Sequence, residues 1–276
     1  MSLPNITHGP QRRPPRIIIL GEPKLGKSTW ASQSAAPIFI PVKGEEGIDA
    51  LDVDKFPVAC TFEEVLADLD MLASEQHQYK TIVIDSASAL EPLVWKSTVA
   101  AHADKGQKNV EDFGFAKGYI FALDEWRKVM ERLDVLRARG MTSIIIGHAR
   151  SKTVMTPDTE PYDSWVWDIH DKAASLFYRW ADFIGFAGRV VSVTHGDRKD
   201  SATDLGRWLF TQRSATHPCG GRGAYGHLPE RIELSFPAFR AAYAAAEKAD
   251  AERKRALEEA IAAHNAAHSQ SSPDKE

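Results

Sequence analysis

The sequence predicts an α/β fold with a mainly parallel central sheet, helices on its faces and an antiparallel hairpin near the C-terminus. Three observations lead to this fold class. Short apolar runs alternate with longer segments of helical periodicity, which is typical of βαβ units. The first apolar run breaks into a glycine-containing turn before a helical pattern begins. Further along, two strand-like runs flank a polar connection, which is typical of a hairpin.

The individual strands are predicted from runs rich in β-branched and aromatic residues. Parallel strands are expected at residues 16–20, 38–42, 81–85, 143–147 and 183–186. The hairpin strands are expected at residues 190–194 and 207–211, on either side of an Asp- and Gly-containing stretch.

Helical periodicity predicts one long covering helix over residues 119–139. Its apolar positions recur at helical spacing and are interpreted as core residues, namely Tyr119, Leu123, Trp126, Met130 and Leu133. An Ala-rich, charged segment at 240–268 predicts a solvated helix. We therefore expect a flexible segment at 1–15, a core at 16–239, this helix, and a disordered tail at 269–276.

Composition limits the class of protein. With 276 residues, of which 43% are hydrophobic and 26% charged, the chain can bury a full core as one large domain or a domain plus an appendage. No apolar run approaches the roughly 20 residues that span a bilayer, and the N-terminus lacks an apolar signal region. Cys60 and Cys219 indicate reduced thiols, so a cytoplasmic protein is expected. A net charge of −4 excludes a surface that is basic throughout.

The turn after the first strand matches the phosphate-binding pattern G-x4-GK[ST]. Glycine lets the backbone turn tightly so that its amides converge on phosphate oxygens at the N-terminal end of a helix. The pattern predicts that Lys27 reaches the β and γ phosphates of ATP and that the Ser28 hydroxyl is a ligand of Mg²⁺. The candidate binding residues are Gly21, Glu22, Pro23, Lys24, Leu25, Gly26, Lys27, Ser28 and Thr29.

Carboxylates at two other strand ends are candidates for hydrolysis chemistry. Asp85 ends the apolar strand at 81–85 and is predicted to assist Mg²⁺, although an Asp at that place also caps helices. Glu45 and Glu46 lie in a Gly-flanked turn after the strand at 38–42, and one of them is expected to orient water. Solvated turn glutamates are the alternative interpretation.

Several motifs together resemble the RecA-type recombinase core. They are GEPKLGKST at 21–29, Glu46-Gly47, IVIDSAS at 82–88 and IIIGH at 144–148, with DFG at 112–114, KGY at 117–119, WAD at 180–182 and LPE at 228–230. The likeness covers residues 16–239. More closely, the set resembles the phage-encoded, core-only relatives grouped with single-strand annealing proteins of the Sak type.

The resemblance implies an ATPase in which Glu46 polarises the attacking water. It places His148 where RecA-type proteins sense the γ phosphate, a position at which bacterial recombinases carry Gln. It further implies recombination or annealing on single-stranded DNA, a homo-oligomeric filament or ring, a single-strand-binding partner protein, and a bacterial host cytoplasm if the chain is phage-encoded. Two alternatives stay open: a motor or loader of a replication complex, and an NTP-dependent switch that orders loops for a protein partner.

Two segments lie where that family presents loops to single-stranded DNA. They combine cations with aromatic rings, the chemistry of sequence-tolerant binding. The candidates are Lys105, Lys108 and Lys117 in 103–117, and Arg150, Lys152, Trp165 and Trp167 in 149–172. Two observations argue against DNA contact by the second segment. Its acidic residues repel phosphate, and packing of its tryptophans against the domain is the alternative role for these rings. Residues 222–227 are a candidate for reaching a neighbouring subunit's nucleotide. A zinc site is not expected at His217, Cys219 and His227, because three potential ligands are too few.

Overall fold

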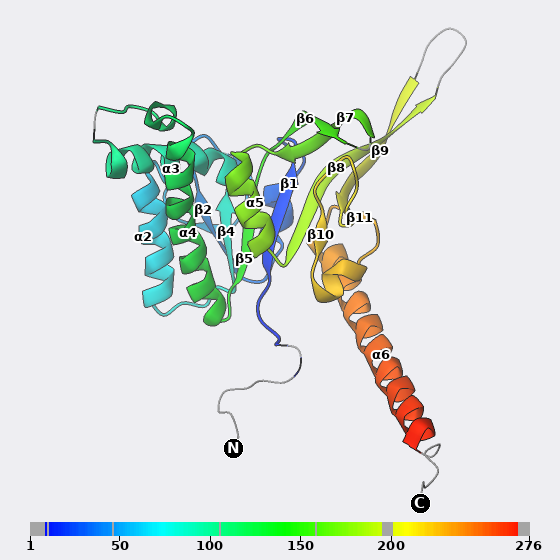
Figure 1. Ribbon diagram of the computed structural model, residues 1–276. Coiled ribbons are helices and arrows are strands. Elements are labelled where there is room, and N and C mark those ends of the chain that lie inside the picture. The colour runs from blue at the N-terminus through cyan, green and yellow to red at the C-terminus, as the bar shows by residue number, and fades with distance from the viewer. Residues whose placement is uncertain are drawn as a thin grey trace, which may run out of the picture.

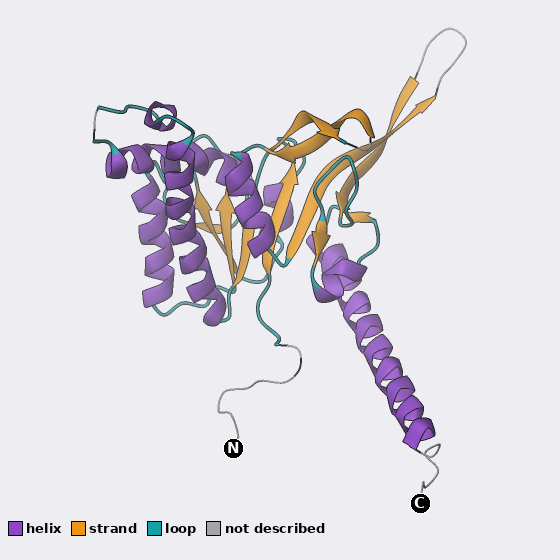
Figure 2. Cartoon of the chain, in the orientation of Figure 1, coloured by secondary structure: helices purple, strands orange, loops and turns teal. Residues whose placement is uncertain are grey.

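A computed structural model describes residues 9, 11–45, 47–104, 106–157, 159–194 and 201–269. Strands and helices alternate through the first two thirds of the chain (Figures 1 and 2). In chain order the elements are β1 (Arg16–Gly21), α1 (Lys27–Ser32), β2 (Pro37–Pro41), η1 (Gly47–Ala50), β3 (Asp54–Lys55), α2 (Phe62–Ser74), β4 (Thr81–Asp85), α3 (Ala87–His102), η2 (Val110–Phe113), α4 (Lys117–Ala138), β5 (Thr142–Ile146), β6 (Ala149–Thr156), β7 (Thr159–Trp167), α5 (Asp171–Trp180), β8 (Phe183–Thr194), β9 (Ser201–Phe210), β10 (Gly220–Gly221), η3 (Gly223–His227), β11 (Arg231–Glu233) and α6 (Phe236–Ser269).

The central sheet has nine strands in the order β11-β9-β8-β1-β5-β4-β2-β3, with β10 paired to β8. All pairings from β8 through β1, β5, β4 and β2 to β3 are parallel. The pairings of β8 with β9 and β10, and of β9 with β11, are antiparallel. The predicted fold class is therefore confirmed: a mainly parallel sheet with flanking helices and an antiparallel extension late in the chain.

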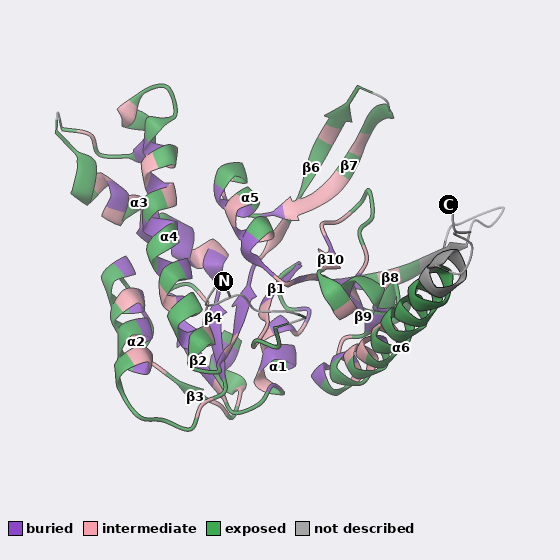
Figure 3. Cartoon of the chain, turned by 60° about the horizontal axis from the view of Figure 1, so that its bottom comes forward, coloured by how far each residue is buried: buried purple, intermediate pink, exposed green. Residues whose placement is uncertain are grey.

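Alternation along β1 divides its side chains between two cores. Ile18 and Leu20 pack with residues of α2, α3, α4 and α5, whereas Ile17 and Ile19 pack with residues of α1, η3 and α6. Successive side chains of a strand point to opposite faces, so this continuous apolar run fits a strand covered on both sides. Figure 3 shows buried residues concentrated in the sheet and on the inner faces of the helices.

The late hairpin is longer than predicted. Residues 183–186 and 190–194, expected as separate strands, form the single strand β8, and β9 runs from Ser201 to Phe210. Gly188 does not interrupt β8, because it lies beside the rings of Phe186 and Phe210, each of which would be 3.1 Å from a Cβ at that position. Glycine here allows close packing rather than a break. The polar connection at 195–200 lies outside the described residues.

The second segment expected as a DNA-facing loop is instead a two-stranded antiparallel sheet, β6-β7. Its β-branched and aromatic residues form a paired ribbon that rises from the carboxyl end of β5 (Figure 1). The first segment contains η2 and leads into α4, which begins at Lys117, close to the predicted start of the long helix.

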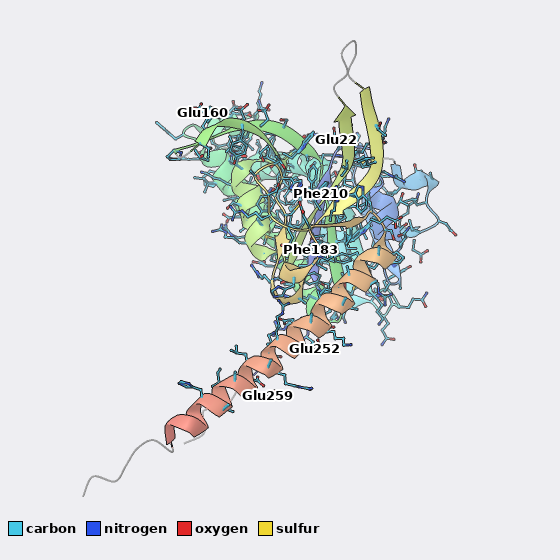
Figure 4. The ribbon with its side chains drawn as sticks, turned by 90° about the vertical axis from the view of Figure 1, so that its right-hand side faces the viewer. Glu22, Glu160, Phe183, Phe210, Glu252 and Glu259 are labelled. Carbon is cyan, nitrogen blue, oxygen red and sulfur yellow. The ribbon has the colours of Figure 1, made fainter. Side chains whose placement is uncertain are left out.

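The last helix, α6, begins at Phe236, within the segment expected to belong to the core. Phe236 and Phe239 are buried and contact Trp30 of α1 at ring-centroid distances of 4.8 and 5.3 Å. Beyond residue 250 every side chain described is exposed, and the helix leaves the body of the molecule with Glu252 and Glu259 in solvent (Figure 4). None of the helices in the described ranges is long and apolar enough to cross a membrane. The expected disorder of residues 270–276, and most of the expected N-terminal segment, lie outside those ranges.

Candidate active site

Four neighbouring parallel strands bring the candidate residues to one edge of the sheet. The order β1-β5-β4-β2 places side by side the loop after β1, His148 after β5, Asp85 at the end of β4 and Glu45 after β2. Ligand sites of open α/β sheets lie at this carboxyl edge.

The loop after β1 has the backbone that its glycines permit. Gly26, the residue before α1, has φ 100° and Lys24 has φ 63°, both in the left-handed region. Gly21 approaches β8 so closely that a Cβ there would lie 2.3 Å from the carbonyl oxygen of Ala187. The loop therefore tolerates no side chain at Gly21 without displacing β8. Leu25 is buried, whereas Glu22, Pro23, Lys24 and Thr29 are exposed.

Lys27 is buried, with 5% of its surface exposed, and folds back onto its own loop. Its Nζ donates to the carbonyl oxygens of Gly21 at 3.0 Å and Glu22 at 2.8 Å. Burial lowers the pKa of Lys27 to about 8, against the raising effect of the nearby Asp85 and Glu45 carboxylates. A cation kept in this poorly solvated place gains from any phosphate that replaces the carbonyls.

Ser28 and Asp85 form the oxygen pair expected for magnesium. The Ser28 hydroxyl donates to Asp85 Oδ2 at 2.6 Å, and Asp85 is 4% exposed. Burial raises the pKa of Asp85, while the Ser28 hydrogen bond and Lys27 oppose that rise. A hydroxyl and a carboxylate are the hard donors that Mg²⁺ prefers, so the two residues present fit this ion.

Glu45 is held in place by two side chains from the neighbouring strand ends. Its Oε1 accepts a hydrogen bond from the Ser86 hydroxyl at 2.9 Å and contacts Nε2 of His148. Burial alone would raise the pKa of Glu45, but the hydrogen bonds from His148 and Ser86 and the positive charge of Lys27 together lower it. The His148 backbone N–H in turn donates to the Ser88 hydroxyl oxygen at 3.0 Å. This carboxylate is thus positioned and kept ionised at neutral pH.

Glu46, the other candidate of the turn, lies outside the described residues. Sequence reasoning placed Lys27, Ser28, Asp85 and His148 at one edge, and the structure brings them together with Glu45. Ser86 and Ser88 were not identified from the sequence as residues of the site, although they follow the strand that ends in Asp85 by one and three positions.

The model of a protein family described as "AAA domain" matches residues 13–222 of this chain. The chain belongs to the AAA domain family. It is accordingly a nucleotide-binding P-loop ATPase domain. The comparison with curated proteins gives no match.

Two solved structures similar to this AAA domain are the RadB recombinase and the flagellar accessory protein FlaH from Methanocaldococcus jannaschii. The RadB recombinase is 14% identical with a TM-score of 0.37, over 72% of this chain and 89% of that one. FlaH is 13% identical with a TM-score of 0.35, over 71% of this chain and 84% of that one.

The residues expected to contact DNA are scattered in the AAA domain. Arg150 and Lys152 of β6 are paired with Asp168 at 3.1 Å and Asp171 at 2.7 Å. Lys108 and Lys117 are exposed around η2, and Lys105 lies outside the described residues. The positive charge on this side of the AAA domain is therefore partly neutralised by its own carboxylates.

The two tryptophans of β7 have different surroundings. Trp167 is 1% exposed and packs against Phe177 and Tyr178, so its ring is a core element and presents no free stacking face. Both tryptophans line a pocket of about 800 Å³ together with Tyr178 and Arg213, but Trp165 is only half-buried. Of the pair, only Trp165 keeps the accessibility that stacking requires.

The late loop of the AAA domain holds His217 and Cys219 with Sγ 3.9 Å from Nδ1, whereas His227 faces Asp250 of α6 at 3.7 Å. Burial raises the pKa of the Cys219 thiol to about 12, which disfavours a thiolate ligand. Within the described part of the chain no group of three or more His, Cys, Asp or Glu side chains is arranged to hold a metal ion.

Proposed function

We propose that this protein binds and hydrolyses ATP with Mg²⁺ and acts on single-stranded DNA in phage-type recombination or strand annealing. The observation that carries the proposal is the contact between Glu45 and His148, because His148 directly precedes β6. His148, which contacts the carboxylate proposed to orient water, is thus the residue immediately before the β6-β7 hairpin that we propose binds DNA.

The chemistry assigns one task to each side chain. Lys27 would leave the carbonyls of its loop and neutralise the β and γ phosphates, and Ser28 and Asp85 would hold Mg²⁺, which supplies further neutralisation of the triphosphate. Glu45, kept ionised by its neighbours, would accept a hydrogen bond from the attacking water. His148 and Ser86 keep that carboxylate in position.

The hairpin β6-β7 supports a role on DNA by its composition and place. Arg150 and Lys152 stand on β6, and Trp165 of β7 lines the nearby pocket together with Arg213. Cations beside accessible rings suit a sequence-tolerant strand, with about 1–3 kcal/mol per stacked base. Both cysteines are free thiols, which supports a reducing compartment such as the cytoplasm.

The decisive experiment measures ATP binding and hydrolysis by the full chain with and without oligo-dT, alongside its mass in solution. We expect ATP to bind, hydrolysis to need Mg²⁺, and oligo-dT to stimulate turnover of a homo-oligomer. Hydrolysis that ignores DNA would favour an NTP-dependent switch, and translocation without strand annealing would favour a motor or loader.

Lys27→Ala is the variant that tests the site itself. Removing the ammonium should lower turnover by about 100-fold or more, because several kcal/mol of phosphate neutralisation disappear. Circular dichroism and thermal unfolding should show a folded protein, since the two hydrogen bonds that Nζ of Lys27 makes within the described residues go to carbonyls of its own loop. Full ATPase activity in Lys27→Ala would remove the assignment.

A further inference from the structure

The strand β9 carries an arginine to the phosphate-binding loop of the same chain. Nη1 of Arg207 donates to the carbonyl oxygen of Leu25 at 3.1 Å. The same nitrogen would lie 3.0 Å from a Cβ built on Gly26, so the guanidinium covers the outer side of the Leu25–Gly26 peptide. The carboxylate of Asp204, which pairs with Arg189, also interacts with the charge of Arg207.

A β-bulge aims this side chain. Arg189 pairs with Arg207 and Val191 with Asp204, so β9 has one more residue than β8 between these two pairs. Gly206 takes φ 101° there, and its N–H donates to Asp204 Oδ1 at 2.9 Å. Bulges twist a strand locally and redirect side chains, often beside active sites.

The register explains why Arg207 reaches the loop. Gly21 at the end of β1 pairs with Ala187, and Ala187 pairs with Leu209. Arg207 therefore stands two residues beyond the end of β1, at the level where the chain turns into the phosphate-binding loop.

We propose that Arg207 is a positioning residue for nucleotide binding in its own subunit, a role that rests on the proposed ATP site. The peptide between Leu25 and Gly26 is trans, so its N–H points away from its carbonyl oxygen. By holding the Leu25 oxygen on the β9 side, Arg207 fixes the Gly26 N–H toward the inner side of the loop. No described residue accepts a hydrogen bond from that N–H, which leaves it as a donor for a phosphate oxygen.

The proposal predicts a loss of affinity more than a loss of chemistry. Arg207→Ala should weaken ADP binding and raise the KM for ATP by about tenfold, the effect of losing one hydrogen bond from a charged donor. The rate at saturating ATP should change much less, because ground state and transition state use the same amide. Arg207→Lys keeps a charged donor and should recover most of the affinity.

Arg231→Ala is the matched control, because it removes the same charge from the adjacent strand and its guanidinium lies over Trp208, 5.0 Å from the ring centroid. Calorimetry with ADP and steady-state ATPase kinetics should give wild-type values for this control. If Arg207→Ala fails to fold, Arg207→Gln, which keeps most of the side-chain stem, takes its place. Unchanged ADP affinity in a folded Arg207 variant would overturn the proposal.

Mixing Lys27→Ala with Arg207→Ala at an ATP concentration well below the wild-type KM, where both variants turn over slowly, distinguishes action within a subunit from action between subunits. Lys27→Ala keeps Arg207, and Arg207→Ala keeps Lys27. Because the arginine acts on its own loop, the mixture should show no more activity than the sum of the two variants. Recovered activity would mean that Arg207 serves a neighbour and would contradict the proposal. Wild-type protein that binds no nucleotide would instead remove the proposed function itself.

Discussion

At the scale of single residues, Glu45 is the side chain that we propose to orient the attacking water. It stands in a turn, yet His148 and Ser86 hold it from two other strand ends. A turn glutamate without such contacts would sample many rotamers and would orient water poorly. The contacts give Glu45 the geometry of a base, while Glu46 stays a prediction from the sequence motif.

Glu45→Gln and Glu46→Gln form a matched pair that decides between the neighbours. Glu45→Gln should still bind ATP but hydrolyse it about 100-fold or more slowly, because an amide is a poor proton acceptor. Glu46→Gln should keep turnover within about threefold of the wild type. Single-turnover hydrolysis and nucleotide affinity separate the two steps, and the reverse pattern would return the role to Glu46.

The sequence could predict the residues of the site that belong to contiguous motifs. Lys27 and Ser28 follow from the G-x4-GK[ST] spacing, and Asp85 from an apolar strand that ends in a carboxylate. Arg207 could not be found in this way, because its contact with Leu25 joins residues 182 positions apart. It depends on the register of β8 and β9 and on a bulge, which local patterns do not encode.

At the scale of elements, α3 ties the site to the hairpin. This helix starts directly after Ser86, and its Glu91 accepts a hydrogen bond from the His170 backbone N–H at 2.8 Å, just before α5. Glu91 is 6% exposed, and burial raises its pKa to about 7, with Asp168 adding to the rise and the His170 hydrogen bond opposing it. A carboxyl is therefore kept half-neutral near physiological pH beneath the base of β6-β7.

Glu91→Gln should stabilise the fold at high pH and not at low pH. The folded pKa of about 7 lies above the ordinary 4.5, so the penalty of the buried charge is absent below pH 4.5, grows as pH rises and is complete above pH 7. Glutamine avoids this penalty, and we expect a gain of about 1–3 kcal/mol at pH 8. Urea unfolding at pH 8 and pH 5 measures it, with the exposed Glu131→Gln as control. An equal effect at both pH values would contradict the buried charge.

Elements were predicted where local pattern and tertiary role agree. The strands β1, β4 and β5 are buried on both faces and read as uninterrupted apolar runs. The sequence predicted two strands in place of β8, because glycines in a sequence indicate a break. The close packing of these glycines against aromatic rings is a tertiary feature that the local sequence does not show. The ribbon β6-β7 was expected as a loop, since exposed polar strands carry a weak hydrophobic signal.

At the scale of the whole molecule, α6 joins a packed half to a solvated half. Its first turns contribute Phe236 and Phe239 to the core with Trp30, whereas its side chains at 251–264 are exposed. A helical segment whose side chains, Leu257 and Ile261 included, are exposed gains little from propensity alone. Its outer half thus adds little to the stability of a single chain.

Removing residues 255–276 should therefore leave the melting temperature within about 3 °C and nucleotide binding unchanged. Phe239→Ala is the contrasting variant, because it empties a site that is 3% exposed and should cost about 3–5 kcal/mol. Thermal unfolding and ADP calorimetry report both. A large loss on truncation would mean that the outer half packs against another copy in solution.

The division of β1 between two cores limits how far a destabilising substitution in one core affects the rest of the molecule. Because Ile17 and Ile19 serve one layer and Ile18 and Leu20 the other, this strand cannot slide or tilt unless both layers loosen together. The loop that follows β1 is therefore held in position by two separate hydrophobic cores. A substitution that loosens the packing of one core leaves this loop fixed by the other core.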